Sequence, residues 1–217
     1  MPKRHTVKLG DCSLSVAAEN GAQKWKAVWD APENKALRAK RDDPFTLSPG
    51  DELVIPDVTP KKVAVATGQT HTFVVTRPKA RVRVRLMSRA LDGAEKATSG
   101  ASCSIKVGDT NTKVTTDGEG WCEAVVPAQA TQALLTVEGA KDRPAARWTL
   151  ALGALRPAKE REGAAARLAN LGYGVAGEDP LACLPYALRA FQEDAKLTVT
   201  GELDAATMDA LRPRHGV

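Results

Sequence analysis

The chain has 217 residues, a formal net charge of +5, 43% hydrophobic residues and only 4% aromatic residues. Its length allows one large domain or two to three small ones, and its composition predicts cores packed from valine, alanine and leucine. The positive excess lies in residues 58–155, which carry 14 lysines and arginines against 8 acidic residues. A nucleic-acid binder usually has a clustered basic footprint, so we expect no nucleic-acid partner.

The N-terminal residues are basic but are not followed by the apolar core of a signal peptide, and no run approaches the length of a membrane span. We therefore expect a protein made in the cytoplasm, without membrane insertion. The four cysteines, Cys12, Cys103, Cys122 and Cys183, show no CxxC spacing, so we expect no metal and no other cofactor. Free thiols are the default in the cytosol, but Cys103 and Cys122 share a segment and a disulfide between them stays open.

Residues 1–57 predict a strand, two helices and a second strand. Residues 5–10 alternate in strand fashion, and residues 13–34 place apolar side chains at helical spacing with an interruption at Gly21. Residues 47–56 predict a turn followed by a short strand. The two strands must pair and be covered by the helices if they are to bury apolar surface.

Residues 58–155 contain no long helical pattern and predict a β-sandwich. Short β-type runs, separated by turn residues, occupy 61–68, 71–77, 80–88, 102–108, 112–116, 121–128 and 133–139. Asp117-Gly118 between two of these runs is a strong hairpin signal. Alternation predicts that Val82 and Val84 face one side of their strand and that three arginines face the other. These are Arg81, Arg83 and Arg85.

Residues 156–217 predict a three-helix module. The first helix is expected to end at Gly172, the second to start near Pro185, and the third to follow Asp204. The Asp204 carboxylate is placed to accept from the backbone N–H of Thr207. Four apolar residues form the predicted inward row: Leu188, Phe191, Leu203 and Leu211.

The predicted fold class is therefore multidomain α+β, with a small βααβ unit, an all-β sandwich and a three-helix module. The predicted domains are residues 1–57, 58–155 and 156–217. Polar, proline-containing linkers are expected at residues 55–62 and 155–163.

Residues 168–173 and 187–211 closely resemble the three-helix peptidoglycan-binding domain appended to many bacterial wall hydrolases. The positions that carry the resemblance are Leu168, Leu171, Gly172, Tyr173, Phe191, Gln192, Leu197, Thr200, Gly201, Asp204, Thr207 and Leu211. The glycine-rich approach to the second helix that is usual in that family is replaced here by GEDPLACLPY. The resemblance implies ligand contacts at Tyr173, Gln192 and Thr200.

Residues 5–21 and 47–56 resemble the opening and the closing strand of a LysM domain, a module for N-acetylglucosamine polymers. The resemblance implies a glycan groove between two loops. The first contains Gly10, Asp11, Cys12 and Ser13, and the second contains Phe45, Thr46, Leu47 and Ser48. The middle segment is similar to Ig-like or prealbumin-like sandwiches. The order of the three segments resembles bacterial proteins encoded beside spike and toxin components of type VI secretion.

Each candidate residue has a structural alternative. The first loop can simply cap the first helix, and Trp25 and Trp29 can be core residues rather than a sugar-stacking platform. We expect Gln192 to be exposed. The three arginines form either a solvated sheet face or a docking strip for an acidic partner.

An enzyme is not expected, because the three histidines are scattered and no HExxH, GxSxG or P-loop motif occurs. The leading hypothesis is a non-catalytic protein that binds peptidoglycan or a chitin-like glycan. It would reach the cell wall or periplasm through a contractile secretion or toxin-delivery apparatus. The alternative is an adaptor that docks a toxin on a secretion spike without binding glycan.

Overall fold

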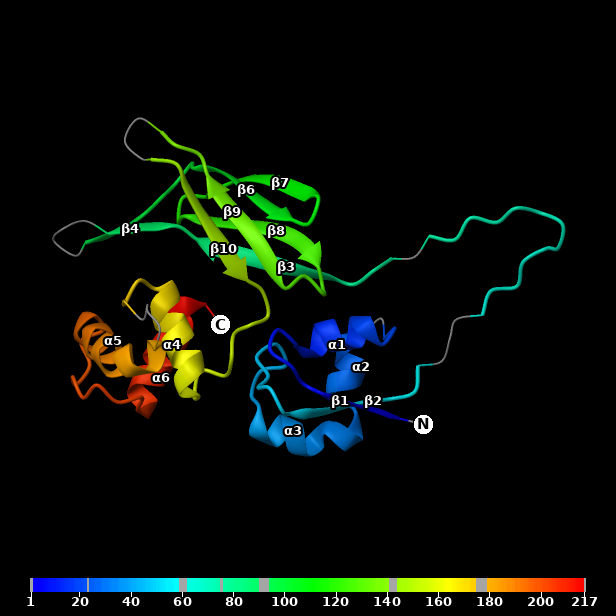
Figure 1. Ribbon diagram of the computed structural model, residues 1–217, viewed down its shortest axis with the longest axis horizontal. Helices are drawn as coiled ribbons and strands as arrows, with labels where there is room; N and C mark the ends of the chain where they lie inside the picture. The colour runs from blue at the N-terminus through cyan, green and yellow to red at the C-terminus, as the bar shows by residue number, and fades with distance from the viewer. Residues whose placement is uncertain are drawn as a thin grey trace.

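In the computed structural model the chain forms three hydrophobic clusters, and each cluster is built from one stretch of the chain (Figure 1). The structure describes residues 2–22, 24–58, 62–74, 76–89, 94–140, 144–174 and 179–216. We call residues 2–58 the N-terminal unit, 62–78 the arm, 79–155 the sandwich and 156–216 the C-terminal module. The mixed α+β fold class is confirmed. The exact domain boundaries remain a prediction.

In the N-terminal unit, β1 (Lys3–Thr6) pairs antiparallel with β2 (Glu52–Ile55). The helices α1 (Ser13–Glu19), α2 (Trp25–Trp29) and α3 (Lys35–Lys40) follow β1, with a 3₁₀ turn at Pro32–Asn34 before α3. The sequence did not predict α3, because only one of its side chains, Leu37, is buried. The buried amide of Asn34 donates to the carbonyls of Val28 and Val54 and therefore ties α2 to β2.

The sandwich has a four-stranded sheet in the order β10-β9-β6-β7, and its second layer contains β3 paired with β8 and β4 paired with β5. The strands are β3 (Lys79–Arg85), β4 (Met87–Arg89), β5 (Glu95–Ala97), β6 (Ser102–Val107), β7 (Thr110–Thr115), β8 (Trp121–Pro127), β9 (Gln132–Val137) and β10 (Ala146–Ala151). Ile105 and Leu135 lie in the core between the layers, together with Cys103 and Cys122, which do not form a disulfide. The turn at Asp117 forms, but β7 and β8 on either side of it pair in different sheets, so the expected hairpin is wrong.

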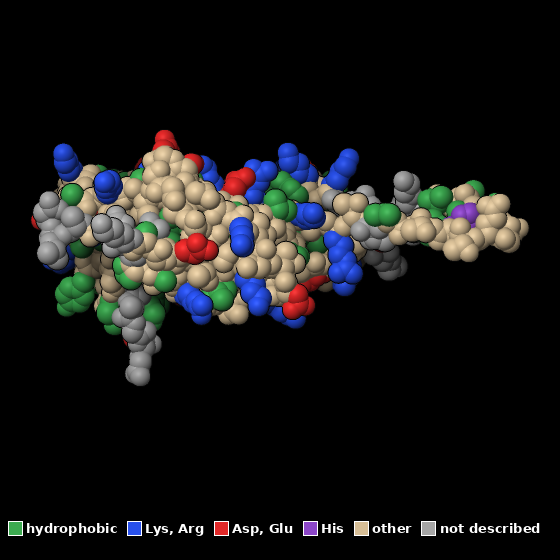
Figure 2. Space-filling view, turned by 90° about the horizontal axis from the view of Figure 1, so that it is seen from above, with side chains coloured by type: hydrophobic (Ala, Val, Ile, Leu, Met, Phe, Trp, Pro, Cys, Tyr) green, Lys and Arg blue, Asp and Glu red, His purple; other side chains and the backbone are tan. Residues whose placement is uncertain are grey.

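The predicted strands at residues 61–68 and 71–77 are also wrong for every residue of theirs that the structure describes. These residues lie in the arm, which leaves the body of the protein and returns to it at β3 (Figures 1 and 2). Within the arm Val74 is 89% exposed. Apolar and β-branched residues favour a strand only where a neighbouring strand pairs with them, and the described residues of the arm have no such pairing.

The C-terminal module consists of α4 (Arg161–Asn170), α5 (Pro180–Asp194) and α6 (Ala205–His215) around Phe191. The predicted Asp204 cap is confirmed, since its carboxylate accepts from Thr207 N–H at 2.8 Å. The predicted start of the second helix is wrong. Asp179 caps α5 and Pro180 occupies its first turn, so Pro185 lies inside the helix.

A buried ionic cluster joins the N-terminal unit to the C-terminal module. Arg41, whose side chain is 5% exposed, lies 2.7 Å from Asp51 and 2.6 Å from Glu160. Glu160 also accepts from the hydroxyl of Ser48 at 2.5 Å. Burial raises the pKa of Asp51, but hydrogen bonds from Arg41, the Ser48 N–H and Lys40 outweigh it and set that pKa to about 2.

Candidate functional site

The two loops expected to border a LysM groove lie side by side. The backbone N–H of Ser13 donates to the carbonyl of Pro44 at 3.0 Å and joins the first loop to the second. Gly10 has a φ of +96°, which glycine adopts without strain. The Asp11 carboxylate accepts from Lys8 N–H at 2.8 Å and lies 2.7 Å from His5 Nε2. The geometry therefore brings the two loops together, and glycan binding between them stays a prediction.

The interpretation of the first loop as a helix cap is confirmed. The Cys12 sulfur accepts from Ser15 N–H, and the Ser15 hydroxyl accepts from Cys12 N–H at 2.9 Å. Ser13 is fully buried, and its hydroxyl has no hydrogen-bond partner among the described residues. A bulky residue at Ser13 would therefore disturb the interior instead of only obstructing a groove.

The second loop is mostly interior. Thr46, Leu47 and Ser48 are buried, and Leu47 belongs to the core of the N-terminal unit. Phe45 is 43% exposed, and its ring centre lies 4.9 Å from that of Trp25 in an edge-to-face arrangement. Of the four predicted residues in this loop, Phe45 is therefore the one best placed to touch a ligand.

The two tryptophans have different roles. Trp29 is buried in the core, as the structural alternative predicted, whereas Trp25 is partly buried and packs beside Phe45. A partly exposed aromatic pair of this kind offers apolar surface to a sugar ring. The partnership of Trp25 with Phe45 was missed, because residues 25 and 45 are far apart in sequence and no local pattern joins them.

The expected exposure of Gln192 is wrong, since its side chain is fully buried. Its amide oxygen accepts from the backbone N–H groups of Thr200 and Gly201 at 2.9 and 2.8 Å. Its amide nitrogen donates to Thr200, Thr207 and the carbonyl of Glu202. Gln192 therefore holds the α5–α6 connection in shape, and a ligand could reach it only after that connection opened.

The other two candidates in the C-terminal module differ in accessibility. Thr200 is exposed at the α5–α6 connection. Tyr173 is 7% exposed, donates to Asp194 at 2.9 Å and lies under the guanidinium of Arg89 from β4. Burial raises the Tyr173 pKa, so the hydroxyl keeps its proton and remains a donor. A ligand at Tyr173 would compete with Arg89.

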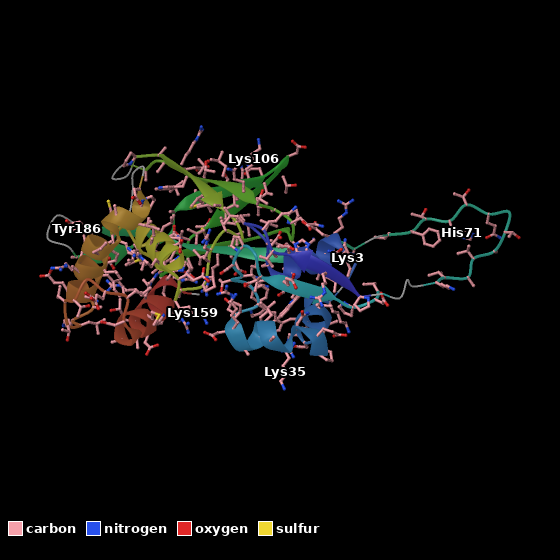
Figure 3. All side chains as sticks on the ribbon, turned by 60° about the horizontal axis from the view of Figure 1, so that its bottom comes forward. Lys3, Lys35, His71, Lys106, Lys159 and Tyr186 are labelled. Atoms are coloured by element: carbon pink, nitrogen blue, oxygen red, sulfur yellow. The ribbon has the colours of Figure 1, made fainter. Side chains whose placement is uncertain are left out.

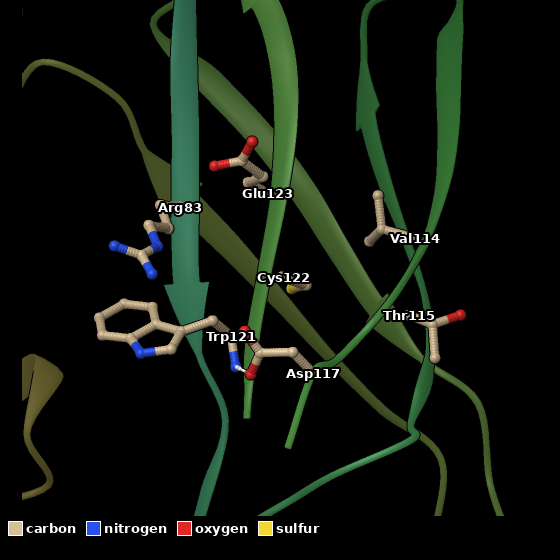
Figure 4. Close-up of a pocket in the computed structure, with 7 residues that line it drawn as sticks. All are labelled: Arg83, Val114, Thr115, Asp117, Trp121, Cys122 and Glu123. Carbon is tan, nitrogen blue, oxygen red and sulfur yellow. Dashed lines mark hydrogen bonds between the residues drawn. The ribbon is translucent and has the colours of Figure 1, made fainter. Parts of the chain in front are cut away.

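The three arginines of β3 lie on the exposed face of the β3–β8 layer, as the alternation predicted. A hollow of about 340 Å³ beside β8 is lined by Arg83, Asp117, Trp121 and Glu123 among others (Figure 4). The Arg83 guanidinium lies 4.2 Å from the centre of the Trp121 ring and covers the face on which a sugar would stack. This hollow is therefore a poor sugar site, while Arg81 remains exposed beside Glu123.

No group of three or more histidine, cysteine or acidic side chains able to hold a metal occurs in the described part of the chain. Among the same residues, no helix is both long and apolar enough to span a membrane.

The C-terminal module matches a known family. Residues 184–211 match the model of the family described as "Putative peptidoglycan binding domain". The matched stretch contains most of α5 and α6, together with the connection that Gln192 holds. No curated protein and no solved structure matches the chain.

Proposed function

We propose that this chain is a non-catalytic peptidoglycan-binding protein. The family match over residues 184–211 carries the proposal, because that family is described by binding and not by a reaction. The paired loops of the N-terminal unit and the exposed ring of Phe45 support a second contact with the glycan. Two weak contacts on one chain gain on the order of 10²–10⁴ in avidity on a repeating polymer when both engage.

Retention of the purified chain on isolated sacculi tests this function. We expect the chain to sediment with sacculi and a control protein of similar charge to stay in solution. Retention no greater than that of the control would overturn the proposal.

Substitution of Phe45 tests the N-terminal contact separately. Phe45→Ala should weaken the binding of chitin oligomers, measured by calorimetry, while the C-terminal module keeps part of the affinity for sacculi. The matched control is Val125→Ala, which also shortens an exposed apolar side chain but lies on the sandwich. Equal oligomer binding by both variants would remove Phe45 from the site.

Delivery to the wall by a type VI or other contractile secretion apparatus is part of the proposal. It is supported by the order of the three segments, which resembles that of bacterial proteins encoded beside spike and toxin components. The exposed arginine face of β3 favours the adaptor as a second candidate function, because it offers a basic strip to an acidic spike or toxin. Co-purification with the product of a neighbouring gene, unchanged by added chitin oligomers, would favour the adaptor.

A further inference from the structure

A small hollow lies between the N-terminal unit and the C-terminal module. It is lined by Asp42, Asp43, Thr46, Pro157, Ala158, Lys159, Arg167 and Arg212. Its volume is about 190 Å³, below the roughly 300–1,000 Å³ of ordinary small-molecule sites. The hollow therefore suits one side group of a larger ligand.

The acidic and the basic side chains around the hollow come from different parts of the chain. Both acidic groups, Asp42 and Asp43, come from the loop after α3, and the basic groups come from the C-terminal module. Lys159 stands between the two parts of the chain (Figure 3), and its ammonium donates to the carbonyl of Lys40 at 2.7 Å. A ligand that fits must present a positive group to one side and a negative group to the other.

The ion pair across the hollow is easily opened. Arg212 lies 3.4 Å from Asp42, and the two side chains are 44% and 62% exposed. Pairs so exposed contribute little to stability. A ligand with a carboxylate beside Arg212 and an ammonium beside Asp42 would replace this ion pair and leave neither side chain without a counter-charge. A simple anion bound to Arg212 would displace the Asp42 carboxylate and repel it.

Arg167 adds a reason for a carboxylate at this position. Arg167 is 2% exposed. Burial, together with the like charge of Arg212, lowers the pKa of Arg167 to about 10, although the Asp43 carboxylate raises that pKa in part. An anion near both guanidinium groups would offset their mutual repulsion.

The hollow lies between the two units that carry the candidate glycan contacts. Arg41 and Glu160 hold its two sides together in a buried pair. Thr46 belongs to the predicted groove loop, and Arg212 directly follows the matched residues 184–211. A polymer that touched both units would therefore pass near it.

We propose that this hollow binds a zwitterionic amino-acid end, one carbon bearing both an ammonium and a carboxylate, that projects from a peptide stem of the cell wall. This inference rests on the proposed peptidoglycan binding and assigns part of its specificity to the stem peptide.

The test compares three probes by calorimetry with the full chain. They are a muramyl disaccharide without peptide, the same disaccharide with a tetrapeptide containing meso-diaminopimelate, and the same compound with lysine at that position. Lysine differs by lacking the carboxylate on the distal carbon. We expect the diaminopimelate compound to bind about tenfold more tightly than the lysine compound, which corresponds to about 1.4 kcal/mol.

Variants assign the preference to the hollow. Arg212→Ala should abolish the difference between the two peptides, and Asp42→Ala should weaken both. Arg214→Ala is the matched control, because Arg214 lies on the same helix, pairs with Glu95 and does not line the hollow. Equal binding of the two peptides by the unmodified chain overturns the inference while leaving the proposed function intact. Binding of no probe and no sacculi overturns both, and a preference that survives Arg212→Ala places the site elsewhere.

Discussion

The C-terminal module is held on two sides by arginine–carboxylate pairs of similar length but very different burial. Toward the N-terminal unit, Arg41 and Glu160 are 2.6 Å apart with 5% and 25% of their side chains exposed. Toward the sandwich, Arg89 and Asp194 are also 2.6 Å apart, but both are 40% exposed. Contact distance is therefore the same at the two junctions, while solvent access is not.

This difference predicts different consequences at the two junctions. An exposed pair is screened by water and contributes about 0–1 kcal/mol. In the buried cluster, removal of Arg41 takes the main partner from the buried Asp51 carboxylate, which costs about 3–5 kcal/mol. We therefore expect the N-terminal junction to fix the relative placement of the two candidate binding units. We expect the sandwich junction to open readily and expose Tyr173.

The largest effect is expected for Arg41→Ala. This change leaves the buried Asp51 carboxylate without its main partner and should lower the free energy of unfolding by about 3–5 kcal/mol in denaturant titrations. The matched control is Arg4→Ala, since Arg4 lies 2.9 Å from Glu52 but is 74% exposed. Similar losses in the two variants would contradict the role assigned to burial.

Acid should break the same cluster. The pKa of Asp51 is about 2 in the folded chain and 3.8 ordinarily. The folded pKa is depressed, so the stabilisation is fully present above pH 3.8 and is lost as the pH falls toward 2. The loss should be about 2 kcal/mol in unfolding free energy. Asp51→Asn should lack this component, and an identical pH profile for the variant would show that Asp51 is not its source.

A smaller effect is expected for Glu160→Ala, which removes the acceptor shared by Arg41 and Ser48. Arg41 keeps Asp51, so the expected loss is about 1–3 kcal/mol. Small-angle scattering should also show a larger radius of gyration if the junction opens. Glu162→Ala is the control because Glu162 is more exposed and lies 3.5 Å from Arg156. An unchanged radius would mean that other contacts fix the junction.

The smallest effect is expected for Arg89→Ala at the sandwich junction. The loss in unfolding free energy should be below about 1 kcal/mol and should vanish near 1 M salt, where the screening length is about 3 Å. A double-mutant cycle with Asp194→Ala measures the coupling. A coupling energy that persists in 1 M salt would contradict the prediction that solvent and salt screen this pair.

The sequence by itself determined the features that depend on local signals. The carboxylate of Asp204, three residues before Thr207, predicted the cap of α6, and the alternation around Val82 predicted the arginine face of β3. The pairing of β1 with β2 also followed, because each short strand needed a partner to bury its apolar side. In the first two cases the deciding residues are neighbours along the chain, whereas the strand pairing followed from the general need to bury apolar surface.

The tertiary structure decided what the remaining residues contact. The arm and the paired strands both contain short runs of apolar and β-branched residues, and the presence of a neighbouring strand separates the two cases. Gln192 is polar and looked suited to a ligand, but the connection folded over it uses both ends of its amide. The pair of Arg41 with Glu160 joins residues 119 positions apart. No local pattern encodes such a contact, because it exists only after the units have packed together and excluded water.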